Sequence, residues 1–476
     1  MLPIDHGAIA RRLLLDNPWW SGAIDDPSAT WPRRAHYHAL AQLVRQPVQR
    51  AVVLLGARRV GKTTLLRQLI ADANRSRDLG PVFFASVDAP TYSGLSLDAL
   101  LVLFEELHAH DPRAPRLVIF DEIQYLLDWE RHLKDLVDRY PHTHFIASGS
   151  AGAALKRKST ESGAGRFTDF ELPPLTFAEF LAFSGVTDEV IDLSSPQPLP
   201  KNVSRLAELF VQYVNVGGYP EVVRNDSIRS DMERFVRNDI VQKVLLQDLP
   251  TLYGITNIPE LNKLFTTVAY NSGQLISLEA LSKNSGITKA TIGRYLEYLE
   301  AAFLIIRMRR VDDTARRLQR ERNFKVFLAN PSMRAALFGP VSEDQPAMGA
   351  LAETALVTQY LHAPIFRDLC FARWGQGEVD LVRLDPARQK PMWVLDVKWS
   401  DGACESANAW SGLLDFARSH QLETAYMTSR TVFKTETRGG IRCIVLPLPM
   451  LCFEIGRLAA SQELLQDRYG LPAQRE

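Results

Sequence analysis

A glycine-rich segment, Gly56-Ala-Arg-Arg-Val-Gly61-Lys62-Thr63, carries residue types that bind phosphate. It fits the pattern GxxxxGK followed by Ser or Thr, in which glycines let backbone N–H groups turn toward phosphate oxygens. We expect the Lys62 amine to reach the β- and γ-phosphates and the Thr63 hydroxyl to ligate Mg²⁺. Gly56, Gly61 and Thr64 complete the expected nucleotide-binding set. The spacing therefore predicts a site for ATP and its Mg²⁺ ion.

Two acidic residues end a later apolar run, Arg116-Leu-Val-Ile-Phe-Asp121-Glu122. A buried strand of this kind would place Asp121 beside the Mg²⁺ ion and Glu122 beside the γ-phosphate. Glu122 could then polarise the attacking water as a general base. Together with the glycine-rich segment, this run predicts ATP hydrolysis.

Ser148 and Arg166 each have two interpretations. Ser148 ends the next expected strand, where its hydroxyl would sense the γ-phosphate; the alternative is an ordinary strand-ending Ser-Gly turn. Arg166 follows Gly163-Ala-Gly and would act in trans as an arginine finger, which supplies charge to phosphates on a neighbouring subunit. The alternative for Arg166 is a solvated loop arginine.

A second constellation lies near the C-terminus. The run Met392–Trp399 has the pattern of a strand, whose period of two puts Asp396 and Lys398 on one face. Asp380 lies on the preceding strand-like run, Glu378–Leu384, and Glu353 lies on a helix upstream, from Gly349 to Leu361.

This order resembles the restriction-endonuclease-like core, with a helix Glu, a strand Asp and then Asp-x-Lys. The resemblance implies that Asp380 and Asp396 are Mg²⁺ ligands, that Glu353 is an accessory ligand and that Lys398 is a catalytic lysine. An inactive or binding-only version of the domain is the alternative, because charged faces of exposed strands often contain such residues.

The middle of the chain has the pattern of a helix-turn-helix. A short helix begins at Ile276, Asn284-Ser-Gly286-Ile287 supplies the turn, and Thr288 caps a second helix that runs to about Ala301. Apolar residues recur at helical spacing and are expected to be buried: Ile287, Ile292, Tyr295, Leu296 and Leu299. The outward side chains are those that a recognition helix offers to DNA: Thr288, Lys289, Thr291 and Arg294.

A basic run follows this motif, with a wing strand expected from Phe303 to Arg310. From Ile305 to Lys325 there are eight basic and three acidic residues, a local charge suited to phosphate contact. The expected DNA-binding residues are Lys289, Arg294, Arg307, Arg309 and Arg310. A winged helix that serves only to pack domains together is the alternative.

Alternating strands and helices must position the first site. Apolar runs predict buried strands at Val52–Leu55, Pro81–Val87, Arg116–Asp121, Thr143–Ser148 and Thr168–Leu172. Helices are expected near 62–74, 97–109, 129–139 and 177–183. This alternation predicts an α/β fold with the parallel sheet of a P-loop NTPase.

The expected organisation has five parts. These are an N-terminal lead-in at 1–45, an AAA-type ATPase core at 46–185, a Ser/Pro-rich linker at 186–202, a helical and winged helix-turn-helix domain at 203–325 and a restriction-endonuclease-like α/β domain at 326–476.

The motif order resembles a family of bacterial and archaeal AAA-type ATPases with a restriction-endonuclease-like C-terminal domain. The resemblance covers roughly 40–450 and rests on GARRVGKTTLL, VIFDEIQ, SGS, GR followed by ELPPLTFAEFL, and GGYPEVV. It implies ATPase chemistry and a homo-oligomer, with a hexameric ring as one arrangement.

Composition excludes several other classes. The chain has 476 residues, and Lys+Arg and Asp+Glu number 55 each, so any affinity for DNA must come from local patches. Apolar runs are too short to cross a membrane, and no signal-peptide pattern is visible at the N-terminus. We expect a cytoplasmic protein with no membrane partner.

These features suggest three functions. The first is an oligomeric ATP-dependent motor that remodels or translocates DNA, including branched DNA. The second is an ATP-gated, Mg²⁺-dependent nuclease in genome defence. The third is a signalling or scaffold ATPase whose nuclease-like domain is inactive and only binds.

Overall fold

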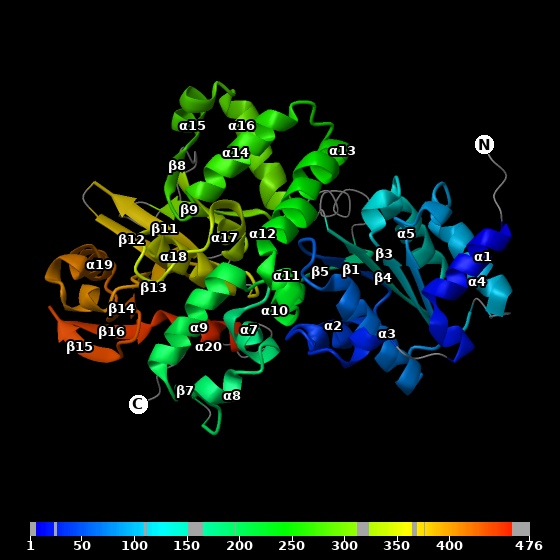
Figure 1. Ribbon diagram of the computed structural model, residues 1–476, viewed down its shortest axis with the longest axis horizontal. Helices are drawn as coiled ribbons and strands as arrows, with labels where there is room; N and C mark the ends of the chain where they lie inside the picture. Colours follow the sequence, from blue (N-terminus) through cyan, green and yellow to red (C-terminus); the bar gives the residue numbers. More distant parts are fainter. Residues whose placement is uncertain are drawn as a thin grey trace. The chain divides into compact units, whose positions relative to one another are not determined.

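The computed structural model describes residues 6–22, 26–108, 111, 113–150, 165–195, 197–311, 323–363, 369–375 and 377–458. The chain divides into two compact units, residues 1–173 and residues 174–476. A five-stranded sheet lies in the first unit and a nine-stranded sheet in the second (Figure 1).

The first unit is built on a parallel sheet in the order β2-β3-β4-β1-β5. Its strands are β1 (Ala51–Leu55), β2 (Val82–Ser86), β3 (Arg116–Asp121), β4 (Thr143–Gly149) and β5 (Phe167–Glu171). Every residue of β1 and β3 is buried, whichever face of the sheet it points to. Both faces of these strands are therefore covered, as expected for a parallel sheet. The prediction of an α/β fold is confirmed.

The helices of this unit surround the sheet. They are α1 (His6–Asp16), η1 (Pro18–Ser21), η2 (Pro27–Thr30), α2 (Tyr37–Val44), α3 (Lys62–Ser76), η3 (Pro90–Tyr92), α4 (Leu97–His108), η4 (Ile123–Tyr125) and α5 (Trp129–Arg139).

The N-terminal lead-in is part of the first unit and packs along strand β2. The Asn17 side chain donates to the Phe84 carbonyl at 2.8 Å and accepts from the Phe84 N–H at 2.7 Å. The indole N–H groups of Trp19 and Trp20 both donate to the Val82 carbonyl. Because β2 lies at the edge of the sheet, these bonds satisfy backbone groups that would otherwise lack strand partners.

The second unit contains most of the helices. They are α7 (Phe177–Phe183), α8 (Thr187–Val190), α9 (Val203–Val216), α10 (Pro220–Arg224), α11 (Asp226–Ser230), α12 (Met232–Arg234), η5 (Phe235–Gln242), η6 (Val244–Asp248), α13 (Leu249–Tyr253), α14 (Ile258–Tyr270), α15 (Leu278–Ser285), α16 (Lys289–Ala301), α17 (Ser332–Phe338), α18 (Ala347–Tyr360), η8 (Asp401–Glu405), α19 (Ala407–Ser419) and α20 (Leu448–Leu458).

The nine-stranded sheet joins two regions that the sequence treats as separate domains. Its order is β15-β16-β14-β13-β12-β11-β9-β10-β8. The strands are β8 (Leu275–Ser277), β9 (Ile305–Val311), β10 (Asn323–Leu328), β11 (Leu369–Trp374), β12 (Gly377–Leu384), β13 (Pro391–Asp396), β14 (Thr424–Ser429), β15 (Lys434–Arg438) and β16 (Ile441–Pro447). Strand β9 pairs with β10 on one side and with β11 on the other. The strands of the predicted winged-helix region and the C-terminal strands therefore form one continuous sheet.

Several predicted bounds differ from the structure. The boundary between 325 and 326 falls inside β10, which the sheet places between β9 and β8. Strand β13 ends at Asp396, so Lys398 lies just beyond it rather than within it. The first helix of the helix-turn-helix begins at Leu278, because Ile276 pairs with Phe324 in the sheet.

The predicted ATPase core extends to residue 185, whereas the compact unit ends at Pro173. Helix α7 begins with a capping box between Thr176 and Glu179 and packs on α9 and α20. Its Phe177 ring lies 5.3 Å from the Phe210 ring, centroid to centroid. This apolar face joins α7 to the second unit. The expected linker contains α8 and a two-stranded ribbon, β6 (Ile191–Asp192) and β7 (Leu199–Pro200).

Among the described residues of both units, no helix is both long and apolar enough to cross a membrane.

Candidate functional site

The glycine-rich loop connects β1 to α3, as the sequence predicts. A Cβ on Gly56 would lie 2.4 Å from the carbonyl oxygen of Leu172, which explains why this position has no side chain. Gly61 has a φ of +98° and directly precedes α3. The loop therefore delivers backbone N–H groups and the positive end of a helix to one point, which suits a phosphate.

The amine of Lys62 lies inside this loop. Its side chain is buried, and Nζ donates to the carbonyl oxygens of Gly56 at 3.0 Å and Ala57 at 2.9 Å. These bonds hold a buried positive charge in the loop. Its contact with the β- and γ-phosphates stays a prediction.

Three oxygen-bearing side chains meet beside the loop, from α3, β3 and β4. The Thr63 hydroxyl donates to Asp121 Oδ2 at 2.7 Å, and the Ser148 hydroxyl donates to Asp121 Oδ1. Thr63 and Asp121 are hard oxygen donors that fit Mg²⁺, which takes few protein ligands and keeps several waters. Ser148 is fully buried and touches Asp121, so it belongs to this cluster rather than to an isolated turn.

Glu122 follows Asp121 with a φ of +52°, which turns its chain away from the strand. Burial is the main reason that the pKa of its carboxyl is raised, and the nearby Lys62 charge opposes this rise. Gln124 donates to Glu122 Oε2 and, at 3.2 Å, to the Ser150 hydroxyl. These contacts hold an acid of raised pKa near the loop, where a general base is needed.

Sequence reasoning missed two residues that position this site, Gln124 and Arg34. Arg34 is buried, and its guanidinium donates to the Val60 carbonyl at 2.6 Å and to the Pro173 carbonyl at 2.8 Å. It therefore ties the phosphate-binding loop to the chain that follows β5. Gln124 stands in the VIFDEIQ motif, so a signal was present, whereas Arg34 lies in the lead-in and has no motif around it.

Arg166 lies immediately before β5, and its backbone carbonyl accepts from the N–H of Ala51 at the start of β1. Its guanidinium pairs with Asp138, and the side chain is 43% exposed. The phosphate-binding loop follows the C-terminal end of β1, whereas Arg166 lies beside its N-terminal end, so Arg166 and its own loop are at opposite ends of the strands. Arg166 is therefore predicted to act on the phosphates of a neighbouring subunit rather than on those of its own loop.

The predicted helix-turn-helix is present in α15 and α16. Gly286 has a φ of +77° in the turn, and the Thr288 hydroxyl accepts from the Thr291 N–H at 3.2 Å to cap α16. The residues predicted to be buried are all buried: Ile287, Ile292, Tyr295, Leu296 and Leu299. Lys289 and Arg294 are exposed, and Lys289 pairs with Glu279 at 3.3 Å.

The wing arginines are arranged differently from the prediction. Arg307 makes two bonds to Glu300 Oε2, at 2.9 and 2.6 Å, and Arg310 donates twice to the Arg373 carbonyl. These contacts within the chain occupy the guanidinium groups of Arg307 and Arg310, which were expected to bind DNA. Arg309, in contrast, is exposed. Arg316, Arg317, Arg320 and Arg322 lie outside the described residues. Lys325 belongs to the same basic run, but its side chain is buried.

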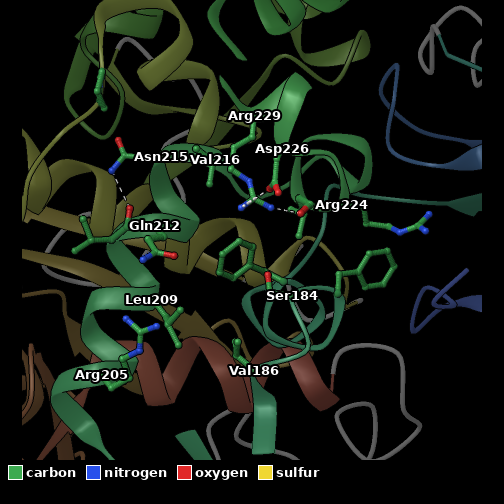
Figure 2. A pocket seen from close by; sticks show the side chains of 15 residues that line it. Ser184, Val186, Arg205, Leu209, Gln212, Asn215, Val216, Arg224, Asp226 and Arg229 are labelled. Atoms are coloured by element: carbon green, nitrogen blue, oxygen red, sulfur yellow. Dashed lines mark hydrogen bonds and ion pairs between the residues drawn. The ribbon is translucent and has the colours of Figure 1, made fainter. Parts of the chain in front are cut away.

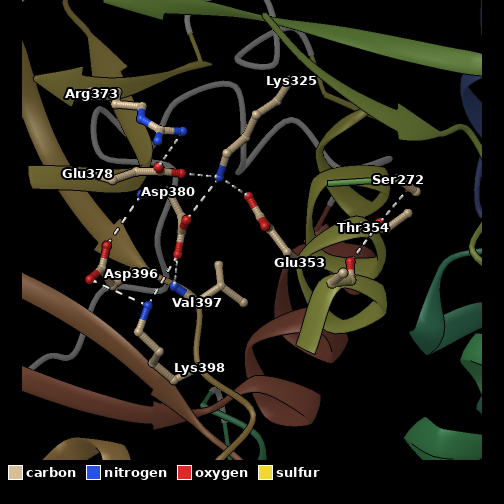
Figure 3. A network of polar contacts seen from close by, with 11 residues as sticks. Ser272, Lys325, Glu353, Thr354, Arg373, Glu378, Asp380, Asp396, Val397 and Lys398 are labelled. Atoms are coloured by element: carbon tan, nitrogen blue, oxygen red, sulfur yellow. Dashed lines mark hydrogen bonds and ion pairs between the residues drawn. The ribbon is translucent and has the colours of Figure 1, made fainter. Parts of the chain in front are cut away.

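The four C-terminal candidates meet in one cluster (Figure 3). Lys398 Nζ lies 3.5 Å from Asp380 Oδ2 and 3.6 Å from Asp396 Oδ2. The Asp380 N–H donates to Asp396 Oδ1 at 3.3 Å. Glu353 joins the cluster through Lys325, whose amine lies between Glu353 and Asp380.

This cluster does not have the geometry of the predicted metal centre. Within the described ranges, no group of three or more His, Cys, Asp or Glu side chains is arranged to hold a metal ion. The amine of Lys325 lies where the oxygens of Glu353 and Asp380 converge. Sequence reasoning missed the role of Lys325 because this lysine lies in a run of basic residues that were expected to be exposed to solvent.

The carboxyl groups of the cluster have unequal affinities for protons. Burial, and then the Asp380 charge, raise the pKa of Glu353 to about 8 and that of Asp396 to about 7. Burial acts in the same direction on Asp380, but Lys325 and Lys398 outweigh it and lower the pKa of Asp380. The native cluster therefore keeps protons that the unfolded chain has released at neutral pH.

We expect the second unit to lose stability as the pH rises from about 4.5 toward 8, because unfolded Glu353 releases its proton before folded Glu353 does. The contribution is fully present below the unfolded pKa and is lost as the pH passes the folded pKa. Urea denaturation at about pH 5.5, 7 and 8.5 measures this loss, and Glu353→Gln should make it smaller. A variant with the same pH dependence as the parent would contradict this assignment.

A separate surface pocket of about 680 Å³ lies between α7, α9 and the α10–α11 region (Figure 2). Two of its arginines pair with nearby acids: Arg205 pairs with Glu189 and Glu208, and Arg229 pairs with Asp226. None of the predicted site residues lines it.

Comparison with known proteins gives two family matches. Residues 48–181 match the model described as AAA domain, and residues 207–344 match one described as Domain of unknown function (DUF8612). An uncharacterized protein of Haemophilus influenzae is 24% identical over 297 residues, which are 60% of this chain and 69% of that protein. Another, from Methanocaldococcus jannaschii, is 26% identical over 331 residues, which are 65% of this chain and 67% of that protein.

Solved structures that resemble this chain have lower sequence identity to it. The ORC2 protein of Aeropyrum pernix is 14% identical with a TM-score of 0.38, over 65% of this chain and 94% of that chain. AMPPCP-bound DnaA of Aquifex aeolicus is 15% identical with a TM-score of 0.28, over 56% of this chain and 86% of that chain. The loop, the parallel sheet and the family match identify residues 48–181 as an AAA-type P-loop ATPase domain.

Proposed function

We propose that this chain is an oligomeric, Mg²⁺-dependent ATPase that uses ATP hydrolysis to act on DNA. The observation that carries the proposal is the meeting of Lys62, Thr63, Asp121 and Glu122 around one loop. Lys62 and Thr63 begin α3, whereas Asp121 ends β3 and Glu122 follows it, and together they supply the parts that phosphoryl transfer requires.

Each residue has a role in the proposed hydrolysis. Lys62 would neutralise the terminal phosphates, and backbone N–H groups of the loop would hold their oxygens. Thr63 and Asp121 would hold Mg²⁺, which when bound offsets the charge on the β- and γ-phosphates. Glu122 would accept the proton of the attacking water, and Gln124 and Ser148 would keep the two acids in place.

The exposed face of α16 supports the DNA part of the proposal. Lys289 and Arg294 are exposed there, on a capped helix that follows a tight turn. A recognition helix presents such residues to the major groove and the phosphates beside it. Because Lys289 and Arg294 are exposed, whereas Arg307 and Arg310 are half-buried, we assign DNA contact first to α16.

DNA is expected to raise the rate of ATP turnover, and this stimulation should weaken as salt increases. A Lys289→Glu/Arg294→Glu double variant should bind DNA more weakly, with a salt slope reduced by about one unit for each lost phosphate contact. Fluorescence anisotropy with labelled duplex DNA at several salt concentrations measures both effects. Lys390→Glu is the matched control, since Lys390 is exposed in the turn between β12 and β13. Unchanged DNA binding by the double variant would remove α16 from the interface.

Arg166 is expected to act on the ATP of a neighbouring subunit. The Arg166→Ala and Lys62→Ala variants should each lose most ATP turnover, since charge from an arginine finger contributes roughly 10³- to 10⁵-fold in rate. Mixing them should restore activity, because mixed oligomers pair an intact loop with an intact arginine. Arg131→Ala, at an exposed position on α5, is the control. Full activity of Arg166→Ala alone would contradict the role in trans.

A further inference from the structure

The amine of Lys325 occupies the centre of the C-terminal polar cluster. Its side chain is 4% exposed, and Nζ lies 2.8 Å from Glu353 Oε1, 2.9 Å from Glu378 Oε1 and 3.0 Å from Asp380 Oδ1. These carboxylates come from α18 and β12, whereas Lys325 comes from β10 (Figure 3). A lysine ammonium has three N–H groups, so three acidic partners at this distance match its capacity.

Oxygens of Asp380 and Asp396 that do not contact Lys325 also have partners within the chain. Asp380 Oδ2 accepts from the Val397 N–H at 2.9 Å and lies 3.5 Å from Lys398 Nζ. Asp396 Oδ1 accepts from the Asp380 N–H. Both oxygens of Asp380 are therefore engaged, one with each lysine, and a metal ion would have to break these contacts in order to bind.

A divalent cation would also have to displace a buried positive charge. The Phe371 ring also encloses the Lys325 amine, with its centroid 5.5 Å from Nζ. Leaving an ammonium buried without its carboxylates costs several kcal/mol. Keeping both cations together adds repulsion between charges in a poorly solvated site.

We infer that Lys325 is the resident cation of this cluster and takes the place of the divalent metal that a restriction-endonuclease-like site would hold. The cluster then binds no Mg²⁺ or Mn²⁺ in the intact chain. Its charges instead hold β10, which belongs to the winged-helix part, against α18 and the C-terminal strand β12. This inference concerns the second unit and is independent of ATP hydrolysis at the loop.

Electron paramagnetic resonance of Mn²⁺ added to the nucleotide-free full-length chain tests the inference. The measurement uses a Thr63→Ala background, which removes a metal ligand of the ATP site. We expect this chain to bind no Mn²⁺ at the C-terminal cluster. Adding Lys325→Met, which removes the charge but keeps an apolar stem, should create one Mn²⁺ site. Adding Asp380→Asn to that variant should abolish the new site.

Two outcomes would overturn the inference. The first is Mn²⁺ binding by the Thr63→Ala chain that disappears with Asp380→Asn, because the metal would then displace the native lysine. The second is a folded Lys325→Met variant that gains no site, because the carboxylates would then not form a metal centre even when vacated. The first arm keeps Lys325 and so remains decisive if Lys325→Met does not fold. Lys398→Met is the matched control and should gain no Mn²⁺, since Lys325 remains in place.

Discussion

A Glu122→Gln substitution is expected to lower the kcat for ATP hydrolysis by roughly 10²- to 10⁴-fold while ATP binding is retained. The amide has the shape of the carboxylate but cannot accept the proton of the attacking water. Lys62, Thr63 and Asp121, which contact the nucleotide and Mg²⁺ in the proposed mechanism, are untouched. Single-turnover hydrolysis and binding of a fluorescent ATP analogue separate the two effects.

Two further observations sharpen this test. Glu106→Gln, at an exposed position on α4, makes the same chemical change away from the loop and should leave kcat unchanged. Because burial raises the pKa of Glu122, activity of the parent chain should fall on the acid side at a higher pH than an ordinary glutamate would give. A Glu122→Gln chain that keeps its parental kcat would exclude Glu122 as the base.

The second large effect is expected from Gly56→Ala, which should abolish ATP binding and destabilise the first unit by about 1–3 kcal/mol. The added Cβ would lie 2.4 Å from the Leu172 carbonyl oxygen and 3.3 Å from its carbon. Both atoms belong to the backbone, so the start of the loop or the chain just after β5 must move. Isothermal titration with ATP and urea denaturation measure the two losses.

Gly349→Ala is the matched control for this change. Gly349 lies within α18, and a Cβ there would meet no atom within 4 Å. Gly349 lies in the first turn of α18, where alanine is tolerated at least as well as glycine, so this variant should be no less stable than the parent. Normal ATP binding by Gly56→Ala would show that the close approach to Leu172 does not shape the loop.

The ATP site could be predicted from the sequence because its parts are local. The glycine-rich loop follows a strand and begins a helix, and Asp121 ends another strand, so each residue is placed by its own neighbours along the chain. The parallel sheet then brings the carboxyl ends of β1, β3 and β4 together. Arg34 could not be foreseen, because it reaches the loop only through the folded path of the lead-in.

The C-terminal cluster was predicted only in part. The order of Glu353, Asp380, Asp396 and Lys398 brings the right residues to one place, but the sequence did not reveal the cation among them. Lys325 lies 28 residues from Glu353 and 55 from Asp380, and it reaches them because β9 and β10 extend the C-terminal sheet. Long-range strand pairing of this kind leaves no local pattern, and a basic run suggested exposure instead.

The boundary between the winged helix and the C-terminal region was misplaced for the same physical reason. The sequence of β10 does not indicate which strands flank it. In the structure, the parallel pairing of β9 with β11, which includes Cys370 with Arg309, connects the two regions. The relation of the C-terminal sheet to restriction endonucleases remains a prediction.

The most direct test of the central claim is the rate of ATP turnover by the intact chain and by Lys62→Ala, each with and without duplex DNA. The account predicts turnover by the intact chain that increases with DNA, and no turnover by the variant under either condition. Hydrolysis that persists without the Lys62 amine, or a parental rate that DNA leaves unchanged, would contradict it.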